Sequence, residues 1–345
     1  MYFNHIKKTI IEIMKTTIFE KYTSYRIKPK NFKLEDEKLF KHEFIKTIER
    51  SYYFYLTNPS IINLEIYKFK PYTKYTKFGK EKKIRILKDF IKNNLKLEET
   101  VVLENGLWIF DNKAHVYGHF LMDTLMRFTS LDKDIKKNIP ILIPHQFNID
   151  WILEIFDFFD APYIVLKENV RYKIRTLLVT SLIAEPGNFN KEALSIMKER
   201  FMKIFLNYIN NEKFKTYEKI WIDRKFARRP VKNFGEIEIV LQRHGYHIVN
   251  LETLSLVEKI ALISNCRVLA GTHGSGHSNM LFMKKNSIII DVRDPNDNIK
   301  NAFFSLASEL DLNYFYMERE SLDNEIVVDP IKLDNLLNEV DLFKN

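Results

Sequence analysis

The sequence predicts an α/β protein built from two consecutive domains, and three observations lead to this fold class. From residue 99 onward, short apolar runs alternate with segments of helical periodicity. The chain has 345 residues, enough for two domains with cores of their own. The polar segment at residues 210–216 is the best candidate for a linker between them. Strands that alternate with helices imply mostly parallel sheets with short connections, and two such domains would face each other across a cleft.

Composition and charge narrow the class of protein further. Hydrophobic residues make up 46% and charged residues 29%, which is typical of soluble globular proteins. The net charge of +9 is compatible with phosphate-bearing partners or an anionic membrane surface and does not choose between them. The single cysteine, Cys266, excludes a disulfide framework and favours a reducing compartment. With no membrane-spanning apolar run and no signal-peptide pattern, we expect a cytoplasmic protein, or one peripheral to the inner face of the cell membrane.

Residues 1–98 are expected to form a basic, mixed helical N-terminal extension. Helices are predicted at residues 6–19 and 35–49. The stretch from Tyr67 to Lys88 interleaves aromatic residues with nine lysines or arginines and one acidic residue. Such a surface can bind anionic lipid headgroups or nucleic acid. The alternative is a solvated basic surface whose aromatic side chains turn into the core.

The first α/β domain is expected at residues 99–212. Asn148 is positioned to cap one of its helices. The predicted strands lie at residues 101–103, 107–110, 140–144, 163–166 and 176–179, and the predicted helices at 117–129, 148–159 and 191–209.

The second α/β domain is expected at residues 213–329, followed by a C-terminal helix within 330–345. Asn233 and Glu236 are spaced as a capping pair at the start of its first helix. Predicted strands lie at residues 219–223, 247–249, 266–270, 287–291, 314–316 and 325–328, and predicted helices at 233–244, 255–264, 302–310 and 330–342.

The most informative stretch is the glycine-rich loop at residues 271–279. Three of the nine glycines fall within six residues there, and an apolar helix is expected to begin at Met280. A strand, a glycine loop, a helix and a second strand are typical of a nucleotide-binding unit. Backbone N–H groups at such a helix start can bind an anion. The loop matches neither the dinucleotide motif nor the P-loop, and the alternative is a tight turn that binds nothing.

A second constellation lies on the predicted helix at residues 117–129. Steps of four residues place His119, Asp123 and Arg127 on one stripe. An imidazole oriented by a carboxylate can act as a general base, and the arginine can hold a phosphate or fix the carboxylate. The alternatives are a structural polar network and a metal site formed by His115, His119 and Asp123.

A third constellation follows the first strand of the second domain. Residues 224–229 contain four lysines or arginines. They follow the carboxyl end of a predicted parallel strand, which is where ligands bind in such folds. Arginines there could neutralise a diphosphate. The alternative is a solvated turn. The pair Asp132 and Asp134 matches a short metal-binding signature of sugar transferases, but its charged surroundings indicate a solvated helix end.

Taken together, these blocks resemble family 61 glycosyltransferases, whose domain is also described as a capsular polysaccharide biosynthesis domain. Three blocks carry the resemblance: residues 117–127 (YGHFLMDTLMR), residues 221–236 with Arg224, Arg228, Arg229, Asn233 and Glu236, and residues 271–282 (GTHGSGHSNMLF). The match covers roughly residues 100–295. The sequence departs from the family pattern at Phe120, Met126, Lys259 and His277, and His277 is the change closest to the donor loop.

The resemblance implies a GT-B fold and inverting transfer from a nucleotide-sugar, with UDP as the expected nucleotide and with neither a metal nor another cofactor. It implies His119 or Asp123 as the catalytic base, without deciding between them. The acceptor would be a glycan or glycolipid of capsular polysaccharide or lipopolysaccharide synthesis. The implied donor site comprises Arg224, Arg228, Arg229, His273, Gly274, Ser275, Gly276, Asn279 and, at the ribose, Asp291, and the implied supporting residues are Arg127, Asn233 and Glu258.

Two other functions remain open from the sequence. The first is a non-catalytic protein that binds nucleic acid or anionic membrane through the basic stretch at residues 67–88, although the glycosyltransferase resemblance implies no nucleic-acid partner. The second is an enzyme that uses NAD or modifies a nucleotide-sugar, which the absence of the dinucleotide motif argues against.

Overall fold

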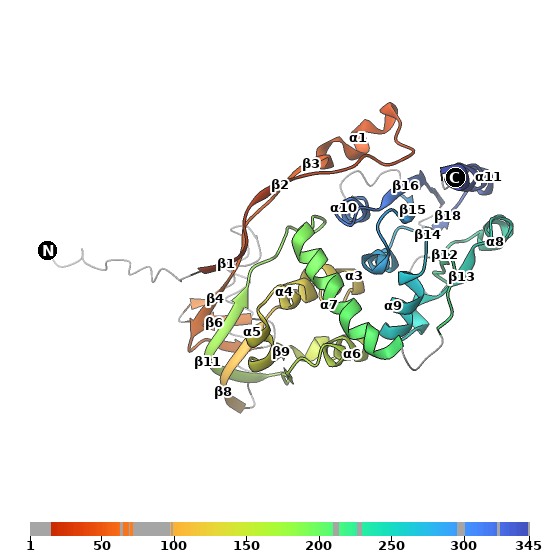
Figure 1. The fold of residues 1–345 in the computed structure, drawn as a ribbon. Coiled ribbons are helices and arrows are strands. Elements are labelled where there is room, and N and C mark those ends of the chain that lie inside the picture. Colours follow the sequence, from red (N-terminus) through yellow and green to blue (C-terminus); the bar gives the residue numbers. More distant parts are fainter. Residues whose placement is uncertain are drawn as a thin grey trace.

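The computed structural model describes residues 15–62, 65–68, 70–71, 97, 99–209, 214–225, 230–294, 301–322 and 325–343. Two sheets with parallel cores, each flanked by helices, make up most of these residues (Figure 1). The predicted α/β class is therefore confirmed. None of the described helices is both long enough and apolar enough to cross a membrane.

The first sheet has nine strands around a parallel core. The order of the core is β10-β9-β8-β11, and all three of its pairings are parallel. The long strand β11 then pairs antiparallel with two short strands in succession, β5 along residues 171–173 and β4 along residues 176–180. Its strands are β1 (Lys15–Phe19), β4 (Ser51–Thr57), β5 (Ser60–Ile62), β6 (Glu65–Lys68), β7 (Lys70–Pro71), β8 (Glu99–Trp108), β9 (Ile141–Ile143), β10 (Tyr163–Val165) and β11 (Val170–Thr180).

The prediction of a helix-rich N-terminal extension is wrong for most of the residues that the structure describes there, which form strands, and only residues 34–43 are helical. Residues 15–19 form strand β1, and residues 35–49 contain only short helical turns followed by strand β3 (Ile45–Ile48). Strands β1 and β3 contain threonine and isoleucine, which favour strands, and pairing with β4 and with β2 (Tyr22–Tyr25), respectively, satisfies their backbone. Most of the basic stretch at residues 67–88 lies outside the described residues.

Helices on the first sheet follow the prediction closely. The helix predicted at residues 117–129 forms as α3 (Tyr117–His119), a π-helix η3 (Phe120–Leu125) and α4 (Met126–Thr129). The others are α5 (Lys133–Asn138), η4 (His145–Phe147), α6 (Asp150–Phe158) and α7 (Lys191–Ile209). The predicted cap at Asn148 is wrong, because α6 begins after Ile149 and no side chain caps it.

The second sheet has five parallel strands in the order β13-β12-β14-β15-β16. The order reverses between β12 and β14, which is where ligands bind in open parallel sheets. Its strands are β12 (Lys219–Ile222), β13 (His247–Val249), β14 (Val268–Thr272), β15 (Ile288–Arg293) and β16 (Asn313–Glu318); the helices are α8 (Phe234–Arg243), α9 (Leu256–Ser264), α10 (Ala302–Glu309) and α11 (Pro330–Phe343), and a hairpin joins β17 (Glu320–Leu322) to β18 (Glu325–Val327).

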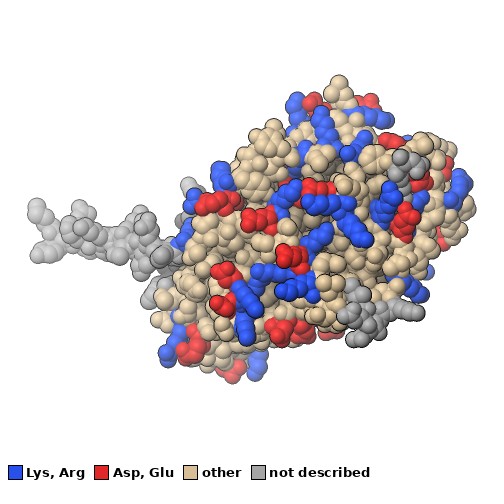
Figure 2. All heavy atoms as spheres, viewed as in Figure 1, with Lys and Arg blue, Asp and Glu red and all other residues tan. Residues whose placement is uncertain are grey.

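The apolar core is continuous between the helices of the two sheets. The ring of Phe201 on α7 lies 5.1 Å from that of Phe282, which follows the glycine loop. Glu154 on α6 accepts a hydrogen bond from the first N–H of α9, at Leu256 (2.7 Å). On the face shown in Figure 2, lysine and arginine side chains alternate with acidic ones over the surface.

Candidate functional site

The start of helix α3 packs directly against the glycine loop of the second sheet. Gly118 makes this approach possible, because a Cβ atom there would lie 2.8 Å from Ser278 Oγ and 3.4 Å from Ser275 Oγ. The Tyr117 hydroxyl donates to Asn279 Oδ1 at 2.8 Å, and Asn279 donates in turn to the Gly276 carbonyl. The helix of the second predicted constellation therefore meets the glycine loop directly, and Asn279 links the two.

The predicted pairing of His119 and Asp123 is present in the structure. Nδ1 of His119 lies 2.6 Å from Oδ2 of Asp123. The imidazole is about one-third exposed, whereas the carboxylate is buried. Because Nδ1 faces Asp123, Nε2 is the ring nitrogen that an incoming hydroxyl group can meet. This is the arrangement of a general base with an orienting carboxylate.

Arg127 does not join this pair as predicted. Its guanidinium is buried and donates to the Ile109 carbonyl at 2.7 Å and to Asp111 at 2.8 Å. The π-helix η3, which contains Asp123 and ends before Arg127, explains the difference, since its wider turns rotate the residues that follow away from the α-helical stripe. Burial lowers the pKa of Arg127 while Asp111 raises it. Arg127 therefore anchors the helix to the end of β8 rather than holding a phosphate.

The glycine loop begins a 3₁₀ helix, η6 (Ser275–Phe282), where an α-helix was expected from Met280. The N–H groups of Ser275 and Gly276 open this helix and so have no partner within it. Arg224 crosses under the loop and donates to the His273 carbonyl at 2.5 Å. A Cβ atom at Gly274 would lie only 2.6 Å from this guanidinium. Glycine at position 274 thus lets the cation lie against the loop.

His273 is held by a buried carboxylate. Its Nδ1 lies 2.9 Å from Asp291 Oδ2, and the Tyr314 hydroxyl donates to the same oxygen at 2.8 Å. Burial alone would raise the pKa of Asp291, but the hydrogen bond and charge of His273, with His277 and Arg293 nearby, bring it well below the ordinary value. The predicted ribose contact of Asp291 does not fit this position, because its side chain is buried beneath His273.

This buried carboxylate predicts a pH-dependent contribution to stability. The folded pKa of Asp291 lies below its ordinary value of 3.8, so the contribution is present above about pH 4 and is lost as the pH falls. Asp291→Asn is expected to lower the free energy of unfolding by about 1.5–3 kcal/mol at pH 7, the usual worth of a hydrogen bond to a charged group. In urea unfolding series, the difference from wild type should shrink on acidification. A difference that is constant down to pH 3 would contradict this reading.

His277, the departure noted in the sequence, is fully buried behind the loop. Its Nε2 lies 3.2 Å from the Ile290 carbonyl, so Nε2 carries the proton, and burial lowers its pKa. The ring stacks on Phe303, with the centroids 5.2 Å apart, and the same phenylalanine lies 4.6 Å from the His273 ring. Neither Phe303 nor Tyr314 was predicted as a site residue, because each lies in an apolar run without a motif.

The predicted supporting residues have structural roles. Asn233 donates to and accepts from the backbone of Val328, which ties α8 to the segment before α11. Glu258 completes a capping box with Ser255 at the start of α9, as its spacing allows. The pKa of Glu258 is lowered by the Ser255 N–H and hydroxyl. Arg228 and Arg229 lie outside the described residues.

The metal alternative finds no support in the part of the chain that the structure describes. Within that part, no three His, Cys, Asp or Glu side chains gather where they could hold a metal ion. His115 does not join His119 and Asp123, and its ring instead lies parallel to that of Phe147 at 6.4 Å.

Comparison with known families agrees with this geometry. The family model described as Glycosyltransferase 61 matches residues 117–290, about half of the 345-residue chain. The chain belongs to the glycosyltransferase 61 family. The match begins at Tyr117, on the helix of the His119 pair, and ends one residue before Asp291, so it spans both sides of the site. It identifies the chain as a glycosyltransferase, which acts on a sugar donor and an acceptor. No curated protein matches this chain.

Proposed function

We propose that this glycosyltransferase is an inverting, metal-independent enzyme that moves a sugar from a UDP-sugar to a glycan acceptor of cell-surface polysaccharide. The observation that carries the proposal is the hydrogen bond between Tyr117 and Asn279. It joins the helix of the His119–Asp123 pair to the glycine loop, whose His273 carbonyl accepts a hydrogen bond from Arg224. One side offers a base and the other offers charge for a diphosphate. Transfer from an activated sugar requires both.

The proposed reaction uses His119 as the base and Asp123 as its orienting partner. The acceptor hydroxyl oxygen attacks the anomeric carbon while its proton passes to Nε2 of His119. The bond between the anomeric carbon and the phosphate oxygen breaks, and the nucleoside diphosphate leaves with the electron pair. Attack from the side opposite the leaving group inverts the configuration of the sugar. Asp123, whose Oδ2 lies 2.6 Å from Nδ1 of His119, stabilises the imidazolium that forms.

The leaving group would be stabilised on the other side of the site. We assign the departing diphosphate to the N–H groups of Ser275 and Gly276, to Arg224 and to His273. Asp291 and Tyr314 would orient His273 rather than contact the ribose. Fixed donors placed where charge develops contribute strongly to catalysis, because they need no rearrangement during the reaction. We include Arg228 and Arg229 as further counter-charges on the basis of the sequence.

A GT-B arrangement of the domains is part of the same proposal. It is supported by the two parallel sheet cores. When the strands of each core are numbered along the chain from one, their spatial orders are 3-2-1-4 in the first sheet and 2-1-3-4-5 in the second. We propose residues 99–212 as the acceptor-side unit and residues 213–329 as the donor-side unit, followed by α11. The N-terminal strands would extend the acceptor-side sheet rather than form a helical extension.

A thermal-shift panel tests the proposal directly. The wild-type protein is heated with UDP, GDP, ADP and UDP-sugars, with and without EDTA. A ligand that binds only the folded state raises the melting temperature by mass action. We expect a shift with UDP that EDTA does not change and that Arg224→Ala removes. A shift that requires a divalent ion would contradict metal-independent transfer, and no shift with any nucleotide would contradict the donor site.

A further inference from the structure

An N-terminal arm, residues 20–50, crosses from the first sheet to the second and has no part in the mechanism above. It leaves the first sheet after β1, which pairs with β4. Strands β2 and β3 then form an antiparallel ribbon, and its tip carries η1 (Leu34–Asp36), α1 (Glu37–Phe40) and η2 (Lys41–Glu43). Figure 1 shows this ribbon running across to α1, beside β16 and α10.

The arm covers the edge strand of the second sheet. The N–H of Lys30 donates to the Tyr314 carbonyl at 2.8 Å. Asn31 pairs with the backbone of Tyr316 in both directions, at 2.7 and 3.2 Å. The Tyr316 hydroxyl donates to Asp36. These contacts satisfy polar groups that an open edge strand would expose.

The arm also holds α10 at both ends. At the first end, Asn301 donates to the Leu39 carbonyl at 2.8 Å and accepts from Arg293 at 2.7 Å. At the other end, Ser308 Oγ accepts from the N–H of Ile27 at 3.0 Å, and Glu309 accepts from the Ser24 hydroxyl. Between these ends, the Phe40 ring meets that of Phe304 edge-on at 5.1 Å.

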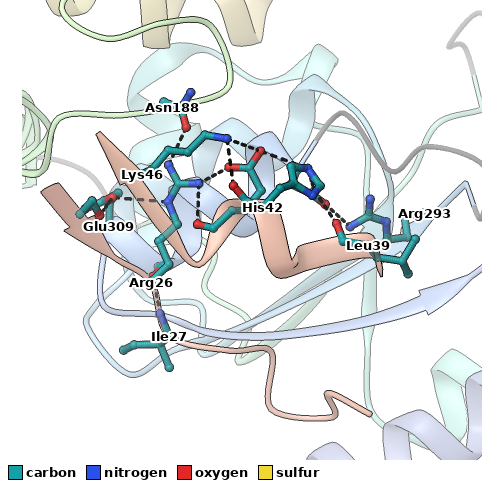
Figure 3. A network of polar contacts seen from close by, with 12 residues as sticks. Arg26, Ile27, Leu39, His42, Lys46, Asn188, Arg293 and Glu309 are labelled. Carbon is teal, nitrogen blue, oxygen red and sulfur yellow. Dashed lines mark hydrogen bonds and ion pairs between the residues drawn. The ribbon is translucent and has the colours of Figure 1, made fainter. Parts of the chain in front are cut away.

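Arg26 forms the centre of this junction, as Figure 3 shows. Its side chain is fully buried and pairs with Glu43 of the arm. It also lies 3.7 Å from Glu309 of α10 and donates to Asn188, before α7, at 2.7 Å. A buried charge is costly to leave unpaired, so this one guanidinium links the arm to α10 and to the segment before α7, which covers the first sheet.

Both elements held by the arm support the imidazole of His273. Helix α10 carries Phe303, whose ring lies against His273 at 4.6 Å. Strand β16 carries Tyr314, which donates to the Asp291 oxygen that also holds His273. The arm therefore reaches the glycine loop by two routes, through packing and through hydrogen bonds.

We infer that the arm positions the donor site: by fixing α10 and β16 it holds His273 ready for the diphosphate of a nucleotide-sugar. The inference rests on the proposed donor role of His273. The arm residues do not touch the reacting atoms and act through Phe303 and Tyr314. Loosening the arm should therefore weaken nucleoside diphosphate binding and raise the donor KM more than it lowers kcat.

The test uses the full chain and the double variant Ser24→Ala/Ser308→Ala, which removes two hydrogen bonds between the arm and α10. Lys41→Ala is the matched control, because it breaks the exposed pair with Glu37 within the arm and leaves α10 untouched. Histidine side chains are observed by NMR well below the melting temperature, and the His273 signal is assigned with His273→Gln. Binding of UDP and GDP is measured by calorimetry on the same samples.

We expect the His273 signal to move in the double variant and not in Lys41→Ala. Affinity for the nucleotide that binds wild type should fall about 2- to 30-fold, the range expected for coupling through intervening contacts. An unmoved His273 signal overturns the inference, whatever the nucleotides do. If the His273 signal moves in the double variant but the wild-type protein binds neither UDP nor GDP, the positioning of His273 by the arm is upheld. The proposed nucleotide donor is then contradicted.

A disulfide cross-link between the arm and α10 tests whether the arm supports the site in a fixed position or must move away for the nucleotide to bind. In Ile27→Cys/Ser308→Cys the new thiols can join the arm to α10 where the N–H of Ile27 now meets Ser308. The native Cys266 is buried and does not compete. The oxidised protein should bind UDP as well as the reduced one. Loss of binding on oxidation that dithiothreitol reverses would show that the arm must leave, which overturns a fixed positioning role.

Discussion

His119→Asn is expected to lower kcat for sugar transfer by about 10²- to 10⁴-fold, the usual contribution of a general base. Asparagine keeps a polar side chain of similar reach and cannot take a proton. Because the imidazole is partly exposed on the acceptor side of the Tyr117–Asn279 contact, nucleotide affinity should not change. The measurement is kcat by nucleotide release, beside calorimetric binding of UDP.

Two further variants make this prediction specific. His115→Asn changes an exposed histidine that precedes the same helix and stacks on Phe147, so its kcat should equal that of wild type. Asp123→Asn should also lose activity, and the double variant with His119→Asn should lose little more, since groups that act as a unit are not additive. Full activity in His119→Asn, or additive losses in the double variant, would exclude this pair as the base.

The sequence predicted the second sheet and the His119–Asp123 pair because both depend on local pattern. Apolar runs such as residues 288–290 are buried on both faces, as parallel strands require. The i,i+4 spacing of the histidine and aspartate persists through the junction with the π-helix. Arg127 was misplaced because no residue pattern in this helix signals the π-turns that rotate it.

The parts that the sequence missed depend on contacts between distant segments. Strand β1 and the arm form through pairing with β4 and with β16, and neither partner can be read from residues 15–50. Tyr314 on β16 is paired with Ile289 on β15. Asp291, two residues further along β15, is on the same face of the sheet as Ile289, so the Tyr314 hydroxyl can reach it diagonally. Residues of this kind become visible as site residues only once the strand order is known.

Gly274→Ala is expected to weaken nucleoside diphosphate binding about 10- to 100-fold, as Arg224→Ala should, while the fold stays intact. The backbone at Gly274 is extended, with φ of 175°, so alanine adds no backbone strain. Its Cβ would lie 2.6 Å from Nη1 and 2.9 Å from Cζ of Arg224. The end of a flexible side chain moves at little cost, so the guanidinium would leave its place and the His273 carbonyl would lose its donor. A hydrogen bond to a charged group is worth about 1.5–3 kcal/mol, which sets the expected range.

Gly235→Ala is the matched control for Gly274→Ala, since its added Cβ meets no atom within 4 Å and helix α8 tolerates alanine. It should bind UDP as wild type does. The double variant Gly274→Ala/Arg224→Ala should bind no more weakly than either single variant, because both remove the same contact. Wild-type affinity in Gly274→Ala, with melting temperatures unchanged, would mean that the charge of Arg224 does not face the diphosphate. Additive losses would mean that the loop and Arg224 bind the diphosphate independently. In that case glycine at position 274 is needed for the N–H groups at the start of η6 to reach the diphosphate, and not to make room for the guanidinium.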